Sequence, residues 1–98
     1  MAERGLDLAK QLDGRSAAKP PEVAPNDADA YINRGRAYHQ LSQYDKAIAD
    51  YTEAIRIDPD YADAYYNRGR AHRELGNLVK AKADFARAKE LGYEPDDE

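Results

Sequence analysis

The 98-residue chain has no cysteine, no tryptophan and no long hydrophobic run. The absence of cysteine excludes disulfides and thiolate chemistry and is compatible with a reducing compartment, so we expect a cytoplasmic protein. No apolar stretch approaches the roughly 18 residues that a membrane-spanning helix needs. The mixed charges of residues 1–7 also differ from the unbroken apolar stretch of a secretory signal. We therefore expect neither a membrane segment nor a membrane partner.

The chain also lacks an excess of positive charge. Its formal net charge is -4, and the C-terminal residues Glu94, Asp96, Asp97 and Glu98 carry four of the negative charges. Residues 28–93, in contrast, carry eleven positive and ten negative charges. A protein that binds nucleic acid through the phosphate backbone would show a basic excess. We therefore expect no nucleic-acid partner.

Residues for catalysis are equally scarce. There is no glycine-rich phosphate loop, and the two histidines are His39 and His72. They lie 33 positions apart, whereas the chain contains an internal repeat with a period of 34 residues. We therefore expect their rings to point in different directions, with His72 inward. We predict that the protein is not an enzyme and has no cofactor, no metal site and no catalytic residue.

What the sequence does contain is an internal repeat of 34 residues. The stretch ADAYINRGRA at residues 28–37 returns as ADAYYNRGRA at residues 62–71. Residues 28–61 are identical to residues 62–95 at 15 of 34 positions. Self-similarity at a fixed period of this size indicates a repeat architecture and not one unique globular core.

Each repeat carries the pattern of a helical hairpin, which predicts an all-α fold. Two stripes with helical spacing are separated by short breaks at residues 42–43 and 76–77, and breaks this short predict antiparallel neighbours. Asn26 and Asp60, each three residues before an aspartate, are the predicted N-caps. The first stripes consist of Tyr31, Gly35, Tyr38 and Leu41, and of Tyr65, Gly69, His72 and Leu75; the second of Tyr44, Ala47, Ile48, Tyr51, Ala54 and Ile55, and of Leu78, Ala81, Phe85 and Ala88.

Two glycines occupy unfavourable places inside these helices. Gly35 and Gly69 lie in mid-helix, where glycine costs roughly 1 kcal/mol relative to alanine, so a packing reason is expected. We predict a close approach of the partner helix at its alanines, with Tyr51 and Phe85 filling the space beside the glycine. The hairpins should therefore close through small residues.

Two arginines recur in step with two aspartates. Arg34 and Arg68 repeat with the same period as Asp50 and Asp84. We predict that these residues have a structural role. Arg68 is expected to pair either with Asp50 of the preceding repeat or with Asp84 of its own.

The spacing of these positions resembles the tetratricopeptide repeat (TPR) signature. The first repeat matches through Tyr31, Gly35, Tyr38, Ala47, Tyr51, Ala54 and Pro59, and the second through Tyr65, Gly69, Ala81, Phe85 and Ala88. In the second repeat His72 replaces the usual aromatic, and Tyr93 stands where the closing proline is expected. The resemblance implies an α-α superhelix of two TPR helical hairpins that serves as a non-catalytic protein-protein interaction module or scaffold.

In such proteins the first helix of each hairpin lines a concave groove that binds peptides or partner segments. The resemblance implies a peptide-binding set of Ile32, Asn33, Arg36, His39 and Gln40 in the first repeat, and of Tyr66, Asn67, Arg70, Arg73 and Glu74 in the second. Arginines hold carboxylates through forked, charge-assisted hydrogen bonds, so the expected partner is an acidic or C-terminal peptide. Family members that clamp the C-terminal carboxylates of chaperone tails use three repeats. Here only Asn67 fits that set, and Ile32 stands where a lysine is expected.

Other interpretations of the same residues remain open. The arginines of an exposed helix face are often solvated or paired with nearby acids. The chain is alternatively a structural protein that self-associates into a homo-oligomer, with its groove filled by its own terminal segments. An engineered or idealised TPR has the same appearance.

The remaining segments complete the expected organisation. Residues 1–25 form an N-terminal extension, with a short helix at 3–13 and a proline-containing flexible linker. Residues 26–93 form the TPR domain, with repeats at 28–61 and 62–95, and residues 94–98 form an acidic tail. In the second repeat Lys82 and Lys89 replace Ile48 and Ile55, so we expect the second hairpin to end the array.

Overall fold

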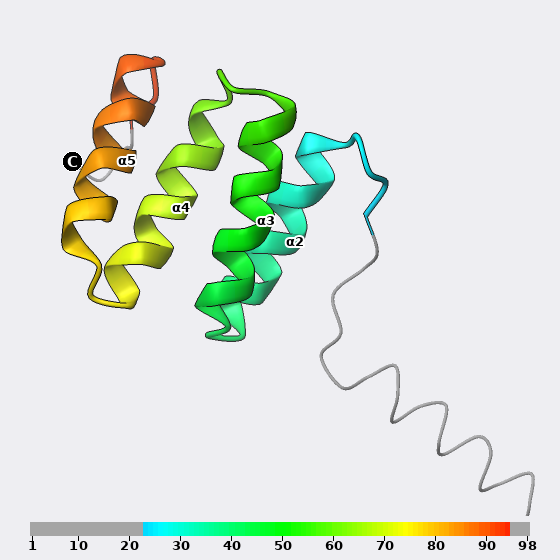
Figure 1. Ribbon diagram of the computed structural model, residues 1–98, viewed down its shortest axis with the longest axis horizontal. Coiled ribbons are helices and arrows are strands. Elements are labelled where there is room, and N and C mark those ends of the chain that lie inside the picture. Colours follow the sequence, from blue (N-terminus) through cyan, green and yellow to red (C-terminus); the bar gives the residue numbers. More distant parts are fainter. Residues whose placement is uncertain (1–22, 95–98) are drawn as a thin grey trace, which may run out of the picture.

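The computed structural model describes residues 23–94, which form four α-helices and no strand. Helix α2 spans Ala28–Gln40, α3 Tyr44–Ile57, α4 Ala62–Glu74 and α5 Leu78–Glu90. Consecutive helices run antiparallel, and α4 packs against both α3 and α5 (Figure 1). The predicted all-α fold of two helical hairpins is confirmed. None of these four helices is long and apolar enough to cross a membrane.

Parts of the sequence-based prediction lie outside this range. The helix expected at residues 3–13 and most of the linker fall within residues 1–22, which the structure does not describe. The last four residues of the acidic tail, 95–98, are also outside the described part of the chain.

The helix starts lie one residue later than expected. The N-cap of α2 is Asp27, not Asn26, because the Asp27 carboxylate accepts a hydrogen bond from the backbone N–H of Ala30 at 3.0 Å. The N-cap of α4 is Tyr61, not Asp60, and its side chain makes no cap bond. The Tyr61 hydroxyl instead donates a hydrogen bond to the carboxylate of Asp29 in the first turn of α2. This bond ties the beginnings of the two repeats together and raises the pKa of Tyr61 to about 12.

The two hairpin turns share one geometry but differ in sequence. Each begins where a leucine ends the first helix, and the next residue has a positive φ. That residue is Ser42 in the first hairpin, with φ 60°, and Gly76 in the second, with φ 81°. Glycine adopts this left-handed conformation at no steric cost, whereas serine does not. The predicted breaks at residues 42–43 and 76–77 are confirmed.

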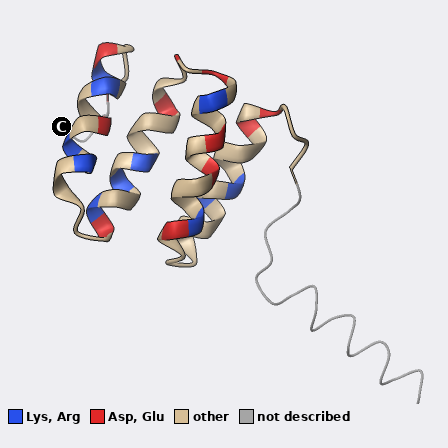
Figure 2. Cartoon of the chain, in the orientation of Figure 1, with Lys and Arg blue, Asp and Glu red and all other residues tan. Residues whose placement is uncertain are grey.

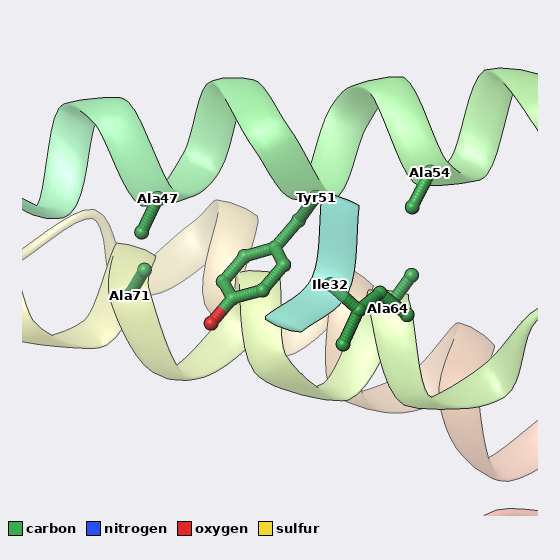
Figure 3. Packing of buried hydrophobic residues seen from close by; sticks show 6 residues of the cluster. All are labelled: Ile32, Ala47, Tyr51, Ala54, Ala64 and Ala71. Atoms are coloured by element: carbon green, nitrogen blue, oxygen red, sulfur yellow. The ribbon is translucent and has the colours of Figure 1, made fainter. Parts of the chain in front are cut away.

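The hydrophobic core lies between α3 and α4 and reaches α2. Figure 3 shows alanines of α3 facing alanines of α4, with the Tyr51 ring between the helices and Ile32 entering from α2. All six residues of this cluster are at most 4% exposed: Ile32, Ala47, Tyr51, Ala54, Ala64 and Ala71. Small side chains let the helix backbones approach closely, so the single large ring of Tyr51 fills the space that remains.

The mid-helix glycines have the packing reason that the sequence predicted. A Cβ atom added at Gly35 would lie 2.5 Å from Cε1 of Tyr51, and one at Gly69 would lie 2.8 Å from Cε1 of Phe85. At Gly69 the backbone oxygen of Ala81 would also be 3.2 Å away. The aromatic ring of the second helix therefore crosses directly over the glycine of the first, which no larger residue would permit.

Three leucines of the predicted apolar stripes are exposed, contrary to expectation. Leu41 is 39% exposed, Leu75 42% and Leu78 59%, although the rest of the stripes are buried or half-buried. These leucines lie at or next to the hairpin turns, where the helices end and no neighbouring helix covers them. Helical spacing alone does not show which residues of an apolar stripe a neighbouring helix covers.

The recurring arginines and aspartates pair within each hairpin. Arg34 donates to Asp50 through Nε and Nη2, both at 2.8 Å, and Arg68 donates to Asp84 in the same forked arrangement at 2.8 Å. The predicted structural role is thus confirmed, and the alternative pairing of Arg68 with Asp50 is wrong. Between the repeats Arg68 instead donates to the hydroxyl of Thr52 at 3.2 Å. Both aspartates are buried, so the forks neutralise carboxylates that would otherwise be costly to bury.

Candidate functional site

The residues predicted to bind a partner come from α2 and α4, which contact each other across the repeat boundary. Most of them are accessible. Asn33, Arg36, Gln40, Arg70, Arg73 and Glu74 are exposed, while His39, Tyr66 and Asn67 are half-buried. We call the surface formed by these nine residues the α2–α4 surface.

Ile32 is the exception and corrects the predicted set. It is 4% exposed and belongs to the core cluster together with Ala64 of α4. The second repeat covers it, so its side chain has no surface to offer a ligand. The equivalent residue of the second repeat, Tyr66, is only half-buried because no further helix of the described chain packs over it.

Two titratable side chains, Tyr51 and His39, are affected by the charges of the arginines. Burial raises the pKa of Tyr51 to about 12, against the opposing charges of Arg36 and Arg70. Burial also lowers the pKa of His39, and the charges of Arg70 and Arg73 lower it further. Because such effects weaken with distance, Arg36 and Arg70 both lie near Tyr51, and Arg70 of the second repeat lies near His39 of the first. The fold thus gathers cationic groups from both repeats on one surface.

The seven arginines of residues 23–94 divide into two groups. Four form ion pairs with carboxylates: Arg34, Arg56, Arg68 and Arg87. The other three are Arg36, Arg70 and Arg73, and none of them forms an ion pair with any residue of the described range. All three are exposed and belong to the α2–α4 surface. Their hydrogen-bond donors are therefore available to an external acceptor.

The wider distribution of charge does not explain this division. Figure 2 shows basic and acidic residues on every helix, with no helix of one sign alone. Acids are therefore available throughout the fold, and Glu74 lies on the same surface close enough to raise the pKa of His39. The unpaired state of the three arginines is a local property of the α2–α4 surface.

An aromatic cluster borders the arginines on the side of α5. The ring of Tyr66 stacks on Tyr93 at 4.3 Å between centroids and contacts Phe85 at 5.5 Å. The guanidinium carbon of Arg70 lies 6.0 Å from the Tyr66 centroid, and that of Arg73 lies 5.5 Å from the Phe85 centroid. Cation–π contacts of this kind hold an arginine in place without using its hydrogen-bond donors.

Tyr93 belongs to this aromatic cluster and was not among the predicted binding residues. It follows α5 and covers Tyr66, whose counterpart Ile32 is covered by a whole helix. The available signal was the departure of Tyr93 from the proline expected at that position.

The asparagines and His39 complete the surface. The Nδ2 group of Asn67 donates to the backbone oxygen of Asp63 at 2.9 Å, which fixes its amide and leaves the side-chain oxygen free of that bond. Asn33 is exposed. The ring of His39 packs edge-on against that of Tyr44, with 5.0 Å between the ring centroids, and the residue is half-buried.

Among residues 23–94, no group of three or more histidine, cysteine, aspartate or glutamate side chains is arranged to hold a metal ion. His72 is 8% exposed and points inward as predicted, and burial lowers its pKa. The histidines therefore face different environments, as their spacing of 33 residues indicated.

Comparison with known proteins identifies several similar chains. A family model described as "TPR repeat" matches residues 35–76, and one described as "Tetratricopeptide repeat" matches residues 62–94. None of the curated proteins that were compared with the chain matches it.

Solved structures similar to this chain include TPR domains, in agreement with the family models. The first TPR of Spaghetti (RPAP3), bound to the HSP90 peptide SRMEEVD, is 34% identical with a TM-score of 0.68, over 69% of this chain and 54% of that one. The second TPR of the same protein, bound to the same peptide, is 38% identical with a TM-score of 0.66, over 71% and 59%. A crystal structure of MamA is 28% identical with a TM-score of 0.63, over 87% and 45%. The chain spans roughly half the length of these structures.

Proposed function

The chain belongs to the tetratricopeptide repeat family, and from this premise we propose that it is a non-catalytic interaction module that captures an acidic peptide on its α2–α4 surface. The observation that carries the proposal is that Arg36, Arg70 and Arg73 form no ion pair within residues 23–94. The other four arginines of this range are all paired with carboxylates. A guanidinium fork matches the geometry of a peptide carboxylate.

The arrangement supports a peptide that lies across the repeat boundary. Arg36 comes from the first repeat and Arg70 from the second, and both act on the hydroxyl of Tyr51. Carboxylates of one extended segment would reach both. The aromatic border at Tyr66 adds apolar contact next to the charges. Similar TPR structures bind a peptide with two adjacent glutamates and a C-terminal aspartate, which is the chemistry proposed here.

The proposal does not extend to HSP90 as the partner. Ile32 is buried, and a clamp for a C-terminal carboxylate was expected to need a lysine there. We infer general recognition of acidic side chains, without a requirement for a free C-terminus.

The test is the binding of fluorescently labelled SRMEEVD, measured by anisotropy, beside a neutral version with Gln for Glu, Asn for Asp and a C-terminal amide. The acidic peptide should bind more tightly, and added salt should weaken it. A charge-assisted hydrogen bond is worth about 1.5–3 kcal/mol, so replacing the three unpaired arginines by alanine should cost at least about a hundredfold in affinity.

The matched control removes the same charge elsewhere. The variant Lys82→Ala/Arg87→Ala/Lys89→Ala also loses three positive charges, but from exposed positions on α5. It should bind the acidic peptide within a few fold of the wild type. If both triple variants lose affinity equally, net charge and not the α2–α4 surface is responsible. If the neutral peptide binds as well as the acidic one, the proposal fails.

A second candidate occupant is the acidic tail of the chain itself, residues 94–98. Tyr93 stacks on Tyr66 beside Arg70, so the tail begins next to the unpaired arginines. This placement supports the alternative in which a terminal segment fills the groove, and in the self-associated form the tail of one copy lies on the α2–α4 surface of another. Deletion of residues 94–98 should then abolish a concentration-dependent increase in solution mass. A wild-type chain that stays monomeric at all concentrations would exclude this alternative.

A further inference from the structure

A separate pocket lies where α3, α4 and α5 meet. Its volume is about 420 Å³, and none of the residues of the α2–α4 surface lines it. The side chains around it come from both repeats. Those that matter for its chemistry are Ile48, Thr52, Arg68, His72, Lys80 and Asp84.

Two residues that line the pocket differ in their surroundings from their equivalents in the first repeat. In the first repeat Tyr38 carries two cations on its ring, with Lys46 Nζ 5.7 Å and the Arg34 guanidinium carbon 5.8 Å from the centroid. In the second repeat the equivalent residue is His72, which is smaller than tyrosine. The equivalent of Lys46 is Lys80, which forms neither an ion pair nor a ring contact within residues 23–94.

Arg68 has unused donors at this pocket. Its Nε and Nη2 groups each donate to Asp84 at 2.8 Å, and Nη1 donates to Thr52 at 3.2 Å. A guanidinium has five N–H groups, so three are engaged and two are not. Because both oxygens of Asp84 accept from Arg68, the pair is neutral as a unit, and Lys80 leaves the pocket with a net positive charge.

His72 supplies a further donor. The amide nitrogen of Asn77 lies 3.4 Å from Nδ1 of His72, and an amide nitrogen can only donate. When Nδ1 accepts from this amide, the neutral ring carries its proton on Nε2. The pocket is therefore lined by an ammonium, an incompletely used guanidinium and an imidazole, which come from two helices.

We propose that this pocket binds a small phosphate-bearing molecule, with the phosphate held by Lys80, Arg68 and His72. A tetrahedral phosphate accepts hydrogen bonds from several directions, which suits donors that are not coplanar, and its charge complements that of Lys80. The volume of about 420 Å³ exceeds what one oxyanion fills, and the apolar side of Ile48 is part of the wall. A phosphomonoester with a compact organic group fits both features.

The test is a titration of the full chain with phenyl phosphate, inorganic phosphate and phenol at constant ionic strength, followed by two-dimensional NMR of the backbone amides. Saturable shifts are expected at His72 and at Ala83, which also lines the pocket, and none at Asn33 on the α2–α4 surface. Tighter binding of phenyl phosphate assigns a monoester. Equal binding of inorganic phosphate assigns the free anion, and either result supports the site.

Two variants make the assignment specific. Lys80→Met should weaken phenyl phosphate about tenfold or more, because a charge-assisted contact is lost. The matched control Lys46→Met removes the equivalent lysine of the first repeat and should leave affinity unchanged. His72→Tyr copies the first repeat, fills the pocket and should abolish binding, while circular dichroism confirms the helical fold. The proposal is overturned if phenol binds as well as phenyl phosphate, if chloride reproduces the shifts, or if Lys80→Met binds like the wild type.

Discussion

Substituting alanine for Gly35 tests the packing of the first hairpin directly. Elsewhere in a helix this change stabilises the fold, because glycine has the lower helix propensity. Here the new Cβ would lie 2.5 Å from Cε1, 2.9 Å from Cδ1 and 3.0 Å from Cζ of Tyr51. The ring of Tyr51 is 1% exposed and cannot move aside without disturbing the core.

The expected effect is the difference between two opposing contributions. Helix propensity favours alanine by about 1 kcal/mol, while overpacking of a filled core typically costs about 1–3 kcal/mol. Three ring atoms at or below 3.0 Å place this site at the upper end, so we expect a net loss of about 1–2 kcal/mol. For a domain of this size that corresponds to a decrease of roughly 4–16 °C in Tm.

The assay is thermal unfolding followed by far-ultraviolet circular dichroism. The matched control is Asn33→Ala, an exposed position on the same helix, where the propensity gain is unopposed and Tm should rise. In a double-mutant cycle with Tyr51→Leu, the loss due to Gly35→Ala should shrink by about 1 kcal/mol or more, because the ring is gone. If Gly35→Ala raises Tm as Asn33→Ala does, the close approach of Tyr51 is refuted.

Three further substitutions address the ion pairs, the buried histidine and the turn. Arg68→Ala should lower the free energy of unfolding in urea by about 2–3 kcal/mol, since it leaves the buried carboxylate of Asp84 unpaired; an unchanged midpoint would contradict this role. Burial lowers the pKa of His72 below 6.5, so the unfolded state binds the proton first. Stability should be fully present above pH 6.5 and fall as the pH decreases, by at most about 1.4 kcal/mol per pH unit, and His72→Phe should flatten Tm against pH; an equal slope in both proteins would count against it. Ser42→Gly should raise stability by about 0.5–1 kcal/mol, because it relieves a positive φ at the place where Gly76 stands in the second hairpin, and a lower Tm would be the opposite result.

Much of the fold followed from spacing along the chain. The period of 34 residues, the two-residue breaks and the mid-helix glycines predicted two hairpins closed through small side chains, and the structure has them. The helix starts were off by one residue, because Asp27 and not Asn26 reaches the free N–H of Ala30. A cap depends on the dihedral angles of one residue, which a pattern of residue types does not specify.

The candidate site was less accessible to sequence reasoning. The three groove arginines were named, but their unpaired state depends on which carboxylates lie within reach, and that is a property of the folded chain. Arg68 shows the same limit: Asp50 and Asp84 were equal candidates by spacing, and only the hairpin geometry selected Asp84.

The sequence by itself determined the units, because helical periodicity and turn residues act between near neighbours. The tertiary structure decided which neighbours the residues of each hairpin pack against. Ile32 and Tyr66 hold the same position in their repeats, yet α4 buries the first and Tyr93 stacks on the second. Tyr38 and His72 are likewise equivalent, and one carries two cations on its ring while the other lines a pocket. A repeat encodes its own hairpin, but the exposure and charge of each side chain depend on the neighbour stacked beside it.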